Sequence, residues 1–136
     1  QISEQLTLNG DNVGSSITQT INGINNVDNR ILNIPTGSIT TIFSFDNVPG
    51  AGTFVTSSFQ YGRITNNSTS ANLKLIVSSS SEVMSYLIST GSSFLLSTSK
   101  VTSSVASSSF NFNDIKSIKV EPSGSSATIE YYIITT

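Results

Sequence analysis

The alternation of apolar and polar residues near the end of the chain constrains the fold more than any other feature. Within the run 127–136, alternate residues from 127 to 133 are apolar: Ala127, Ile129, Tyr131 and Ile133. Successive side chains of a strand point to opposite faces, so these residues share an inward face. Tyr132 and Ile134 make the other face apolar too. Such a strand needs cover on both faces, and we expect the second cover to come from loops of this domain or from another subunit.

Shorter runs of the same kind occur upstream, separated by turn residues. The pattern predicts further strands at 2–8, 39–46, 53–61, 71–77, 94–101 and 115–120, and a strand or a short helix at 82–89. The segment 62–70 is polar and loop-like, and Glu121-Pro122-Ser123-Gly124 suits a type I turn. About eight to ten short strands with regular turns indicate an all-β fold. We expect one antiparallel β-sandwich of the jelly-roll type over residues 1–136.

The segment 39–55 contains the one stretch that resembles a phosphate-binding loop. One face of its first strand is expected to carry Ile39, Thr41, Phe43 and Phe45. Gly50-Ala51-Gly52 follows, but a phosphate loop runs into a helix N-terminus. Here the next residues are Thr53-Phe54-Val55, which are β-branched or aromatic. The segment therefore predicts a strand, a turn and a strand, with a small uncharged loop against which a neighbouring subunit could pack.

The segment 15–34 allows two interpretations. Its apolar residues recur every three or four positions, as on a helix face: Ile17, Ile21, Ile24, Val27 and Ile31. The residues between them are largely Thr, Asn and Gly, which are poor helix formers. Asn22-Gly23 and Asp28-Asn29 are plausible turn dipeptides. We favour short strands, and the alternative is a helical stem of a trimeric fibre. In either case residues 1–34 could form an N-terminal arm or stem.

The composition argues against disorder and against several kinds of partner. Ser, Thr and Asn make up 57 of the 136 residues. Disordered chains combine low hydrophobicity with high net charge, whereas this chain is 36% hydrophobic with a net charge of −2. Its six basic residues form no patch that could follow a phosphate backbone, and no run approaches about 18 apolar residues. We expect no nucleic acid and no membrane partner. A surface of hydroxyls and amides instead favours packing against neighbours.

The residue types also limit the chemistry. With no His and no Cys, histidine triads, cysteine nucleophiles and the common zinc sites are excluded. Most of the eight acidic residues fall at apparent turns, where Asp caps its own backbone. The oxygen-rich turns Asn9-Gly10-Asp11-Asn12 and Asp28-Asn29 lack the alternating acids of a calcium loop. We therefore expect no enzyme activity, no cofactor and no metal. Asn66-Asn67-Ser68 and Asn67-Ser68-Thr69 both match the N-glycosylation pattern, as chance allows in so Asn- and Ser-rich a chain.

Six residues are the candidate ligand or subunit contacts: Phe59, Tyr61, Arg63, Tyr86, Tyr132 and Ile134. Sugars stack on exposed aromatic rings beside polar hydrogen-bonding groups, and the cluster 59–63 has both. The chain has no Trp, the preferred stacking platform, so core packing is the commoner role for such aromatic residues. Tyr132 and Ile134 are candidates because they form the second apolar face of the last strand. A surface glycan is therefore the alternative ligand, and a neighbouring subunit is the first.

The C-terminal unit F-N-F-N-D-I-K-S-I-K-V-E-P-S-G-S-S-A-T-I-E-Y-Y resembles virion structural proteins of tailed bacteriophages. This broad group includes small β-sandwich head-decoration proteins and tail or fibre modules. The resemblance lies in Ser/Thr/Asn-rich strands, few charges, no Cys and a closing hairpin, and it carries no motif from which a functional residue can be transferred. It implies a non-enzymatic capsid decoration or cement protein located in the virion.

Such a protein would bind capsid or tail proteins and copies of itself, as a homo-oligomer such as a trimer. Contacts made by apolar and hydroxyl surfaces depend little on salt, and edge strands with few charges are open to pairing with neighbours. The alternative is a glycan-binding or adhesion module of a tail fibre or secreted particle, located outside the cell or at its surface.

Overall fold

The computed structural model describes residues 2–3, 7–14, 18–97, 101–102, 111–112 and 115–136. Nine strands form the body of the molecule: β5 (Asn26–Ile34), β6 (Thr40–Asp46), β7 (Thr53–Val55), β8 (Phe59–Asn66), β9 (Asn72–Ser78), β10 (Val83–Ile88), β11 (Ser93–Ser97), β14 (Ser117–Ser123) and β15 (Ala127–Thr135). A 3-10 turn, η1 (Thr56–Ser58), lies between β7 and β8. The all-β prediction is confirmed.

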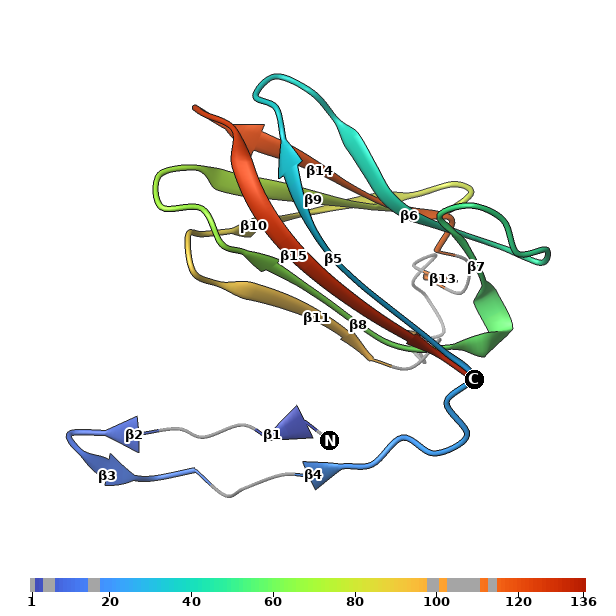
Figure 1. The fold of residues 1–136 in the computed structure, drawn as a ribbon, viewed down its shortest axis with the longest axis horizontal. Helices are drawn as coiled ribbons and strands as arrows, with labels where there is room; N and C mark the ends of the chain where they lie inside the picture. The colour runs from blue at the N-terminus through green and yellow to red at the C-terminus, as the bar shows by residue number, and fades with distance from the viewer. Residues whose placement is uncertain (1, 4–6, 15–17, 98–100, 103–110, 113–114) are drawn as a thin grey trace.

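The nine strands form two sheets that face each other (Figure 1). The four-stranded sheet has the order β11-β8-β15-β5, and the five-stranded sheet has the order β10-β9-β14-β6-β7. If β7 is set aside, the first strand of the body pairs with the eighth, the second with the seventh, the third with the sixth and the fourth with the fifth. This nested antiparallel pairing is the jelly roll.

The core lies between the inner faces of the two sheets. Alternate residues of β9, Leu73, Leu75 and Val77, are buried in the same core cluster as the inward residues of β15. The β15 residues that the alternation predicted to point inward are all buried, so that prediction is confirmed: Ala127, Ile129, Tyr131 and Ile133. Burying each large apolar side chain contributes about 1.5–3 kcal/mol, so this single core dominates the stability.

Aromatic rings fill the core near β6. The Phe43 ring lies 5.6 Å from Phe45 and 6.0 Å from Tyr131, and Phe45 packs edge-on against Phe59 at 5.1 Å. Edge-to-face contacts of this kind suit the ring quadrupoles. Gly62 on β8 makes room for them, because a Cβ there would lie 3.3 Å from the Phe59 ring. A larger residue at position 62 would crowd the rings of Phe59 and Phe43.

One polar side chain is fully enclosed at the far end of the core. Asn66 donates from Nδ2 to the carbonyls of Ala71, at 2.8 Å, and Ile88, at 3.1 Å. Its Oδ1 accepts from the backbone N–H of Ser68 at 3.1 Å. Buried polar groups are tolerated when they are hydrogen-bonded, and these bonds tie the β8–β9 connection to the end of β10. Its burial also makes Asn66 inaccessible to a glycosylation enzyme in the folded chain.

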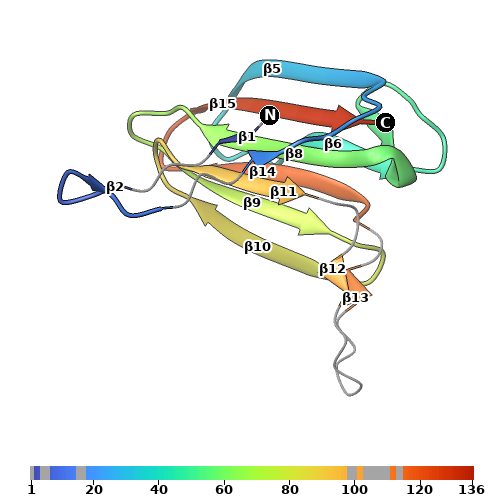
Figure 2. The ribbon, with the colours of Figure 1, turned by 90° about the horizontal axis from the view of Figure 1, so that it is seen from below.

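The described residues before β5, namely 2–3, 7–14 and 18–25, form an arm outside the two main sheets. It contains two small antiparallel pairs: β1 (Ile2–Ser3) with β4 (Thr18–Gln19), and β2 (Thr7–Leu8) with β3 (Asp11–Asn12). Asn9 and Gly10 both have positive φ, as a type I′ hairpin requires. Figures 1 and 2 both place β1 and β4 beneath the outer face of the four-stranded sheet. A further short pair joins β12 (Val101–Thr102) and β13 (Asn111–Phe112).

The structure decides the ambiguity at 15–34 for its described part, residues 18–34. This part contains strands β4 and β5 and no helix, so the preferred interpretation is confirmed there and the helical stem is wrong. The Asp28-Asn29 turn is also wrong, because both residues lie inside β5, paired with Ile133 and Tyr132. Tertiary pairing along nine residues overrides the local turn preference of two. Residues 15–17 lie outside the described residues.

Three other local predictions are corrected. The expected single strand at 53–61 is broken by η1, where the chain passes from the five-stranded to the four-stranded sheet. The segment 62–70, predicted as a loop, begins with the second half of β8. The predicted turn at 121–124 starts later, because β14 continues through Pro122 to Ser123. Pro122 is tolerated there because the pairing of β14 with β6 ends at Val120, so no ladder hydrogen bond is lost on that side.

The shared face predicted for residues 39–45 is also wrong. Phe43 and Phe45 are buried, but Ile39 is 58% exposed and Ile42 is buried instead. The pairing of β6 with β14 shifts register between Ile118 and Lys119. A β-bulge of this kind adds one residue to a strand and moves the following side chains to the other face. The strand, loop and strand predicted for 43–55 are confirmed, although β7 pairs with β6 in parallel.

Candidate interaction surfaces

The outer face of the four-stranded sheet gathers four of the six candidate contacts. Tyr61 and Arg63 lie on β8, and the register places Tyr61 opposite Ile134 and Arg63 opposite Tyr132. The rings of Tyr61 and Tyr132 are 6.5 Å apart and steeply inclined to each other. Because β8 and β15 are paired and their side chains alternate between faces, these four residues form one cluster although the two pairs are far apart in the sequence.

This cluster is largely covered by the chain itself. Tyr61 is 5% exposed and Ile134 is 7% exposed, and Tyr132 is half-buried. The second cover that β15 requires is thus present without another subunit. Burial raises the pKa of Tyr61; Arg63 opposes that rise and Tyr132 adds to it. Arg63 Nη2 lies 3.6 Å from Glu130 Oε1, so the polar part of the cluster is at its exposed rim.

Phe59 and Tyr86 lie elsewhere. Phe59 points into the core, where it packs against Phe45. Tyr86 lies on β10 at the opposite edge of the sandwich, half exposed, with its ring 5.4 Å from that of Phe94 on β11. A sugar needs a ring face that water can reach, and Tyr86 is the most exposed of the candidate aromatic residues.

A second polar cluster lies at the open edge of the sandwich, on β5. Asp28 and Arg30 are two residues apart, so both side chains fall on the inner side of the strand, opposite Ile133 and Tyr131. Tyr131 Oη donates to Asp28 Oδ2 at 2.9 Å, and Arg30 Nε donates to Asp28 Oδ1 at 3.1 Å. The Arg30 side chain is 63% exposed and that of Asp28 is 24% exposed. We call Asp28, Arg30 and Tyr131 the β5 cluster.

The pKa of the Tyr131 hydroxyl is raised by its position in the β5 cluster. Burial, followed by the hydrogen bond to Asp28 and the negative charge of that carboxylate, raises the pKa of Tyr131 to about 12. The nearby Arg30 opposes this shift. All three effects that raise the pKa favour the neutral phenol, so Tyr131 serves as a hydrogen-bond donor to Asp28. Sequence patterns did not indicate the β5 cluster, because Asp28 resembled a turn residue and Tyr131 lies 103 positions away.

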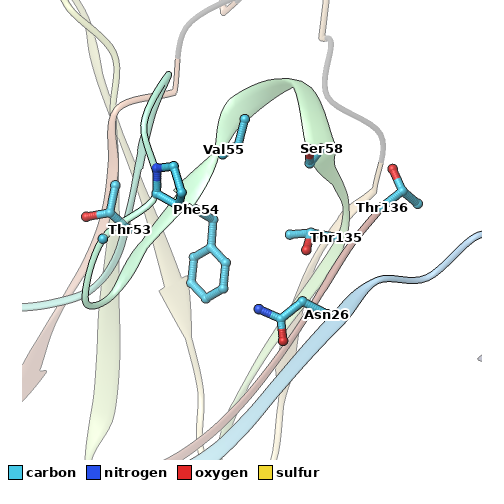
Figure 3. A pocket seen from close by; sticks show the side chains of 9 residues that line it. Asn26, Thr53, Phe54, Val55, Ser58, Thr135 and Thr136 are labelled. Carbon is cyan, nitrogen blue, oxygen red and sulfur yellow. The ribbon is translucent and has the colours of Figure 1, made fainter.

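Two shallow pockets adjoin this edge, and both are partly lined by the β6–β7 loop. One, of about 210 Å³, lies between Phe54 and the end of β15. Figure 3 shows the Phe54 ring pointing into the space in front of Asn26 and Thr135. The other, of about 310 Å³, lies between residues 50–52 of the loop and the start of β5, including Asp28 and Arg30. The small uncharged loop therefore forms a wall of both pockets.

The described residues offer little else for catalysis or metal binding. Within them, no three His, Cys, Asp or Glu side chains come together as a metal site. The described part of the chain also holds no helix with the length and hydropathy needed to cross a membrane. No protein-family model, no curated protein and no solved structure matches this chain.

Proposed function

We propose that the chain is a non-enzymatic virion structural protein that decorates or cements a phage capsid, binding both the particle and copies of itself. The observation that carries the proposal is where its exposed apolar side chains lie. Of the twelve large apolar residues that are exposed in the described residues, seven lie on edge strands of the two main sheets: Val27, Ile31, Val83, Met84, Tyr86, Leu87 and Leu95.

Apolar residues at strand edges suit contacts with other proteins better than capture of a small molecule. Small-molecule sites are concave and enclosed, whereas β5, β10 and β11 present their side chains along the open borders of the sheets. Natural edge strands usually carry Lys or Pro to prevent pairing, and the described residues of these three strands contain neither. The exposed Leu8, Val13 and Ile24 of the arm add a second extended surface.

Particle binding is the direct test. The purified chain would be mixed with capsids of the phage that encodes it, sedimented, and its copy number per capsid measured. We expect saturable binding at a copy number set by the capsid lattice. The paired variant Val83→Ser/Leu87→Ser on β10 should lower occupancy about tenfold or more if that edge contributes, since two hot-spot side chains are each worth about 1 kcal/mol or more. Ser85→Ala, on the same face of the same strand, is the matched control. No binding by the unchanged protein would refute the proposal.

Glycan binding remains a second candidate, and one observation favours it. The half-exposed Tyr86 ring lies beside Phe94 at the open edge between β10 and β11, and jelly rolls also occur as lectin domains. A glycan array should then show a bound sugar class that is lost in Tyr86→Ala and retained in Leu87→Ala. An array without binding would remove this candidate.

A further inference from the structure

The free border of β5 is an open edge of the four-stranded sheet. Asn26–Ile34 pairs with β15 on one side, and no strand in the described residues pairs with it on the other. Figure 2 shows β5 at the border of the molecule, with no strand beyond it. Its nine residues include neither Pro nor Lys. The backbone N–H and C=O groups on that border can therefore accept another strand.

Two inward-facing charges decide which strand can be added. Asp28 and Arg30 lie on the core side of β5, and inward charges on an edge normally prevent pairing. A new strand would place its own side chains directly opposite them, at Cβ separations of about 5 Å. An apolar strand would bury the Asp28–Arg30 pair and leave the remaining N–H donors of Arg30 without acceptors. The strand that fits must place a positive side chain opposite Asp28 and a negative side chain opposite Arg30.

A second copy of β5 meets this requirement. When two copies pair antiparallel about a two-fold axis through Asn29, Asp28 of one lies opposite Arg30 of the other, and the reverse holds on the other side of the axis. We propose that β5 pairs with β5 of a second copy in this register, joining the two four-stranded sheets. Arg30 uses Nε on its own Asp28, and the other four donors of its guanidinium can reach Asp28 of the second copy.

The outer face of the same register is also matched. Val27 lies opposite Ile31 of the second copy, and these are two exposed apolar side chains, at 44% and 69%. The pairing therefore covers apolar surface on one face and places opposite charges next to each other on the other. The contact is isologous, with the same strand used by both copies, so it closes as a dimer.

Neighbouring registers are disfavoured. A two-fold axis perpendicular to the sheet keeps each side chain on its own face, so the axis must pass through a residue position. Moving the axis to position 28 places Asp28 opposite Asp28, and moving it to Arg30 places Arg30 opposite Arg30. Like charges directly opposite each other are destabilising. Moving it to Ile31 places Arg30 opposite Leu32. Charge pairing thus selects the register about Asn29.

This inference rests on the self-association part of the proposed function and makes it specific. A cysteine on the axis gives the sharpest test, because the chain contains no native cysteine. In the proposed register the two Asn29 Cα atoms are about 4.5–5.5 Å apart, within the range for a disulfide. Asn29→Cys should therefore form a disulfide-linked dimer under mild oxidation.

Asn33→Cys is the matched control, because Asn33 is exposed on the same face of the same strand. The two Asn33 positions would be eight residues apart along the paired strands, or about 27 Å, so this variant should not cross-link. Cross-linking yields would be measured on non-reducing gels at equal protein concentration. Equal yields from the two variants would indicate random collision and would overturn the proposal.

Charge reversal in the Asn29→Cys background tests the pairing itself. Asp28→Arg alone or Arg30→Asp alone places like charges opposite each other and should lower the yield about tenfold. The double variant restores opposite charges and should recover the yield. Circular dichroism and the melting temperature of each variant report whether it is folded. Because Asp28 also accepts from Tyr131, Arg30→Asp is the decisive single change if Asp28→Arg unfolds.

Failure of this inference can be told apart from failure of the proposed function. An unchanged chain that sediments as an oligomer, with no cross-link at Asn29→Cys, would refute the β5 register and leave self-association in place. A folded double variant that does not recover the yield would refute the charge pairing. Capsid sedimentation reports on the proposed function separately, whatever the cross-linking shows.

Discussion

Two polar sites next to the core, Asn66 and the β5 cluster, differ in how completely they are enclosed. Asn66 is fully buried, and its side chain makes three hydrogen bonds within the chain. The β5 cluster is open, with the Arg30 side chain 63% exposed and a pocket of about 310 Å³ beside it. The first cluster completes the fold of a single chain. The second has hydrogen-bonding capacity left over, as expected of a group that meets a partner.

Substitution of Asn66 should give the largest effect. Asn66→Ala leaves the carbonyls of Ala71 and Ile88 and the N–H of Ser68 without their side-chain partner in a buried site. We expect the free energy of unfolding to fall by about 3 kcal/mol, measured by urea denaturation. Asn67→Ala, at the neighbouring exposed position, should change it by less than about 0.5 kcal/mol. If the two variants were equally stable, the hydrogen bonds of the buried Asn66 side chain would not stabilise the fold.

High pH should give the second largest effect, because it ionises Tyr131 of the β5 cluster, whereas Asn66 does not titrate. Because the folded pKa of Tyr131 is raised to about 12 from an unfolded value near 10, its contribution to stability is fully present below pH 10. It should be lost as the pH rises from 10 towards 12, by an amount on the order of 2 kcal/mol. Urea denaturation at pH 8 to 11.5 would measure it. Tyr61, whose pKa is also raised, adds a smaller dependence of the same sign.

Tyr131→Phe should have a moderate effect at neutral pH. The change removes one hydrogen bond and leaves Asp28 Oδ2 with access to water, since the Asp28 side chain is 24% exposed. We expect a loss of about 1 kcal/mol, together with a weaker pH dependence above pH 10. An unchanged pH dependence in this variant would show that another group causes it.

Arg30→Ala should have the smallest effect on the isolated chain. The Arg30 side chain is largely exposed, and exposed ion pairs contribute little, so the melting temperature at low protein concentration should hardly move. The same change should lower disulfide formation through Asn29→Cys, because Asp28 of the second copy would lose its partner. A large loss of monomer stability would mean that Arg30 belongs to the fold, as Asn66 does.

The sequence predicts the sandwich well where strands are long and regular. β9 and β15 alternate clearly, and their buried faces match the pattern residue by residue. Predictions failed where the geometry depends on distant pairing. The bulge that moves Ile39 outward is set by β14, and the change of sheet at η1 has no local signal. In the sequence, Pro122 looks like a turn residue. It fits within β14 because β6 does not pair with the strand at that position, which only the arrangement of the sheet shows.

The candidate sites show the same limit. Tyr61 and Arg63 lie about 70 residues from Tyr132 and Ile134 in the sequence, and the two pairs come together because β8 and β15 are paired. Alternation alone would place Phe59 on the same face as Tyr61. A register shift between these two residues instead points Phe59 into the core. The β5 cluster could not be predicted, because it needs Asp28 inside a strand and Tyr131 brought beside it from the other end of the chain.

The pairing of β5 with β15 also has a consequence for how the protein is made. It joins the first strand of the body to the last, so Asn26 and Thr135 become neighbours. A ribosome completes β5 roughly a hundred residues before β15, and until then both borders of β5 lack an intramolecular partner. Contacts across such long separations close slowly. Nascent chains on neighbouring ribosomes could therefore meet through β5 before either sandwich has closed, and assembly would then begin during synthesis.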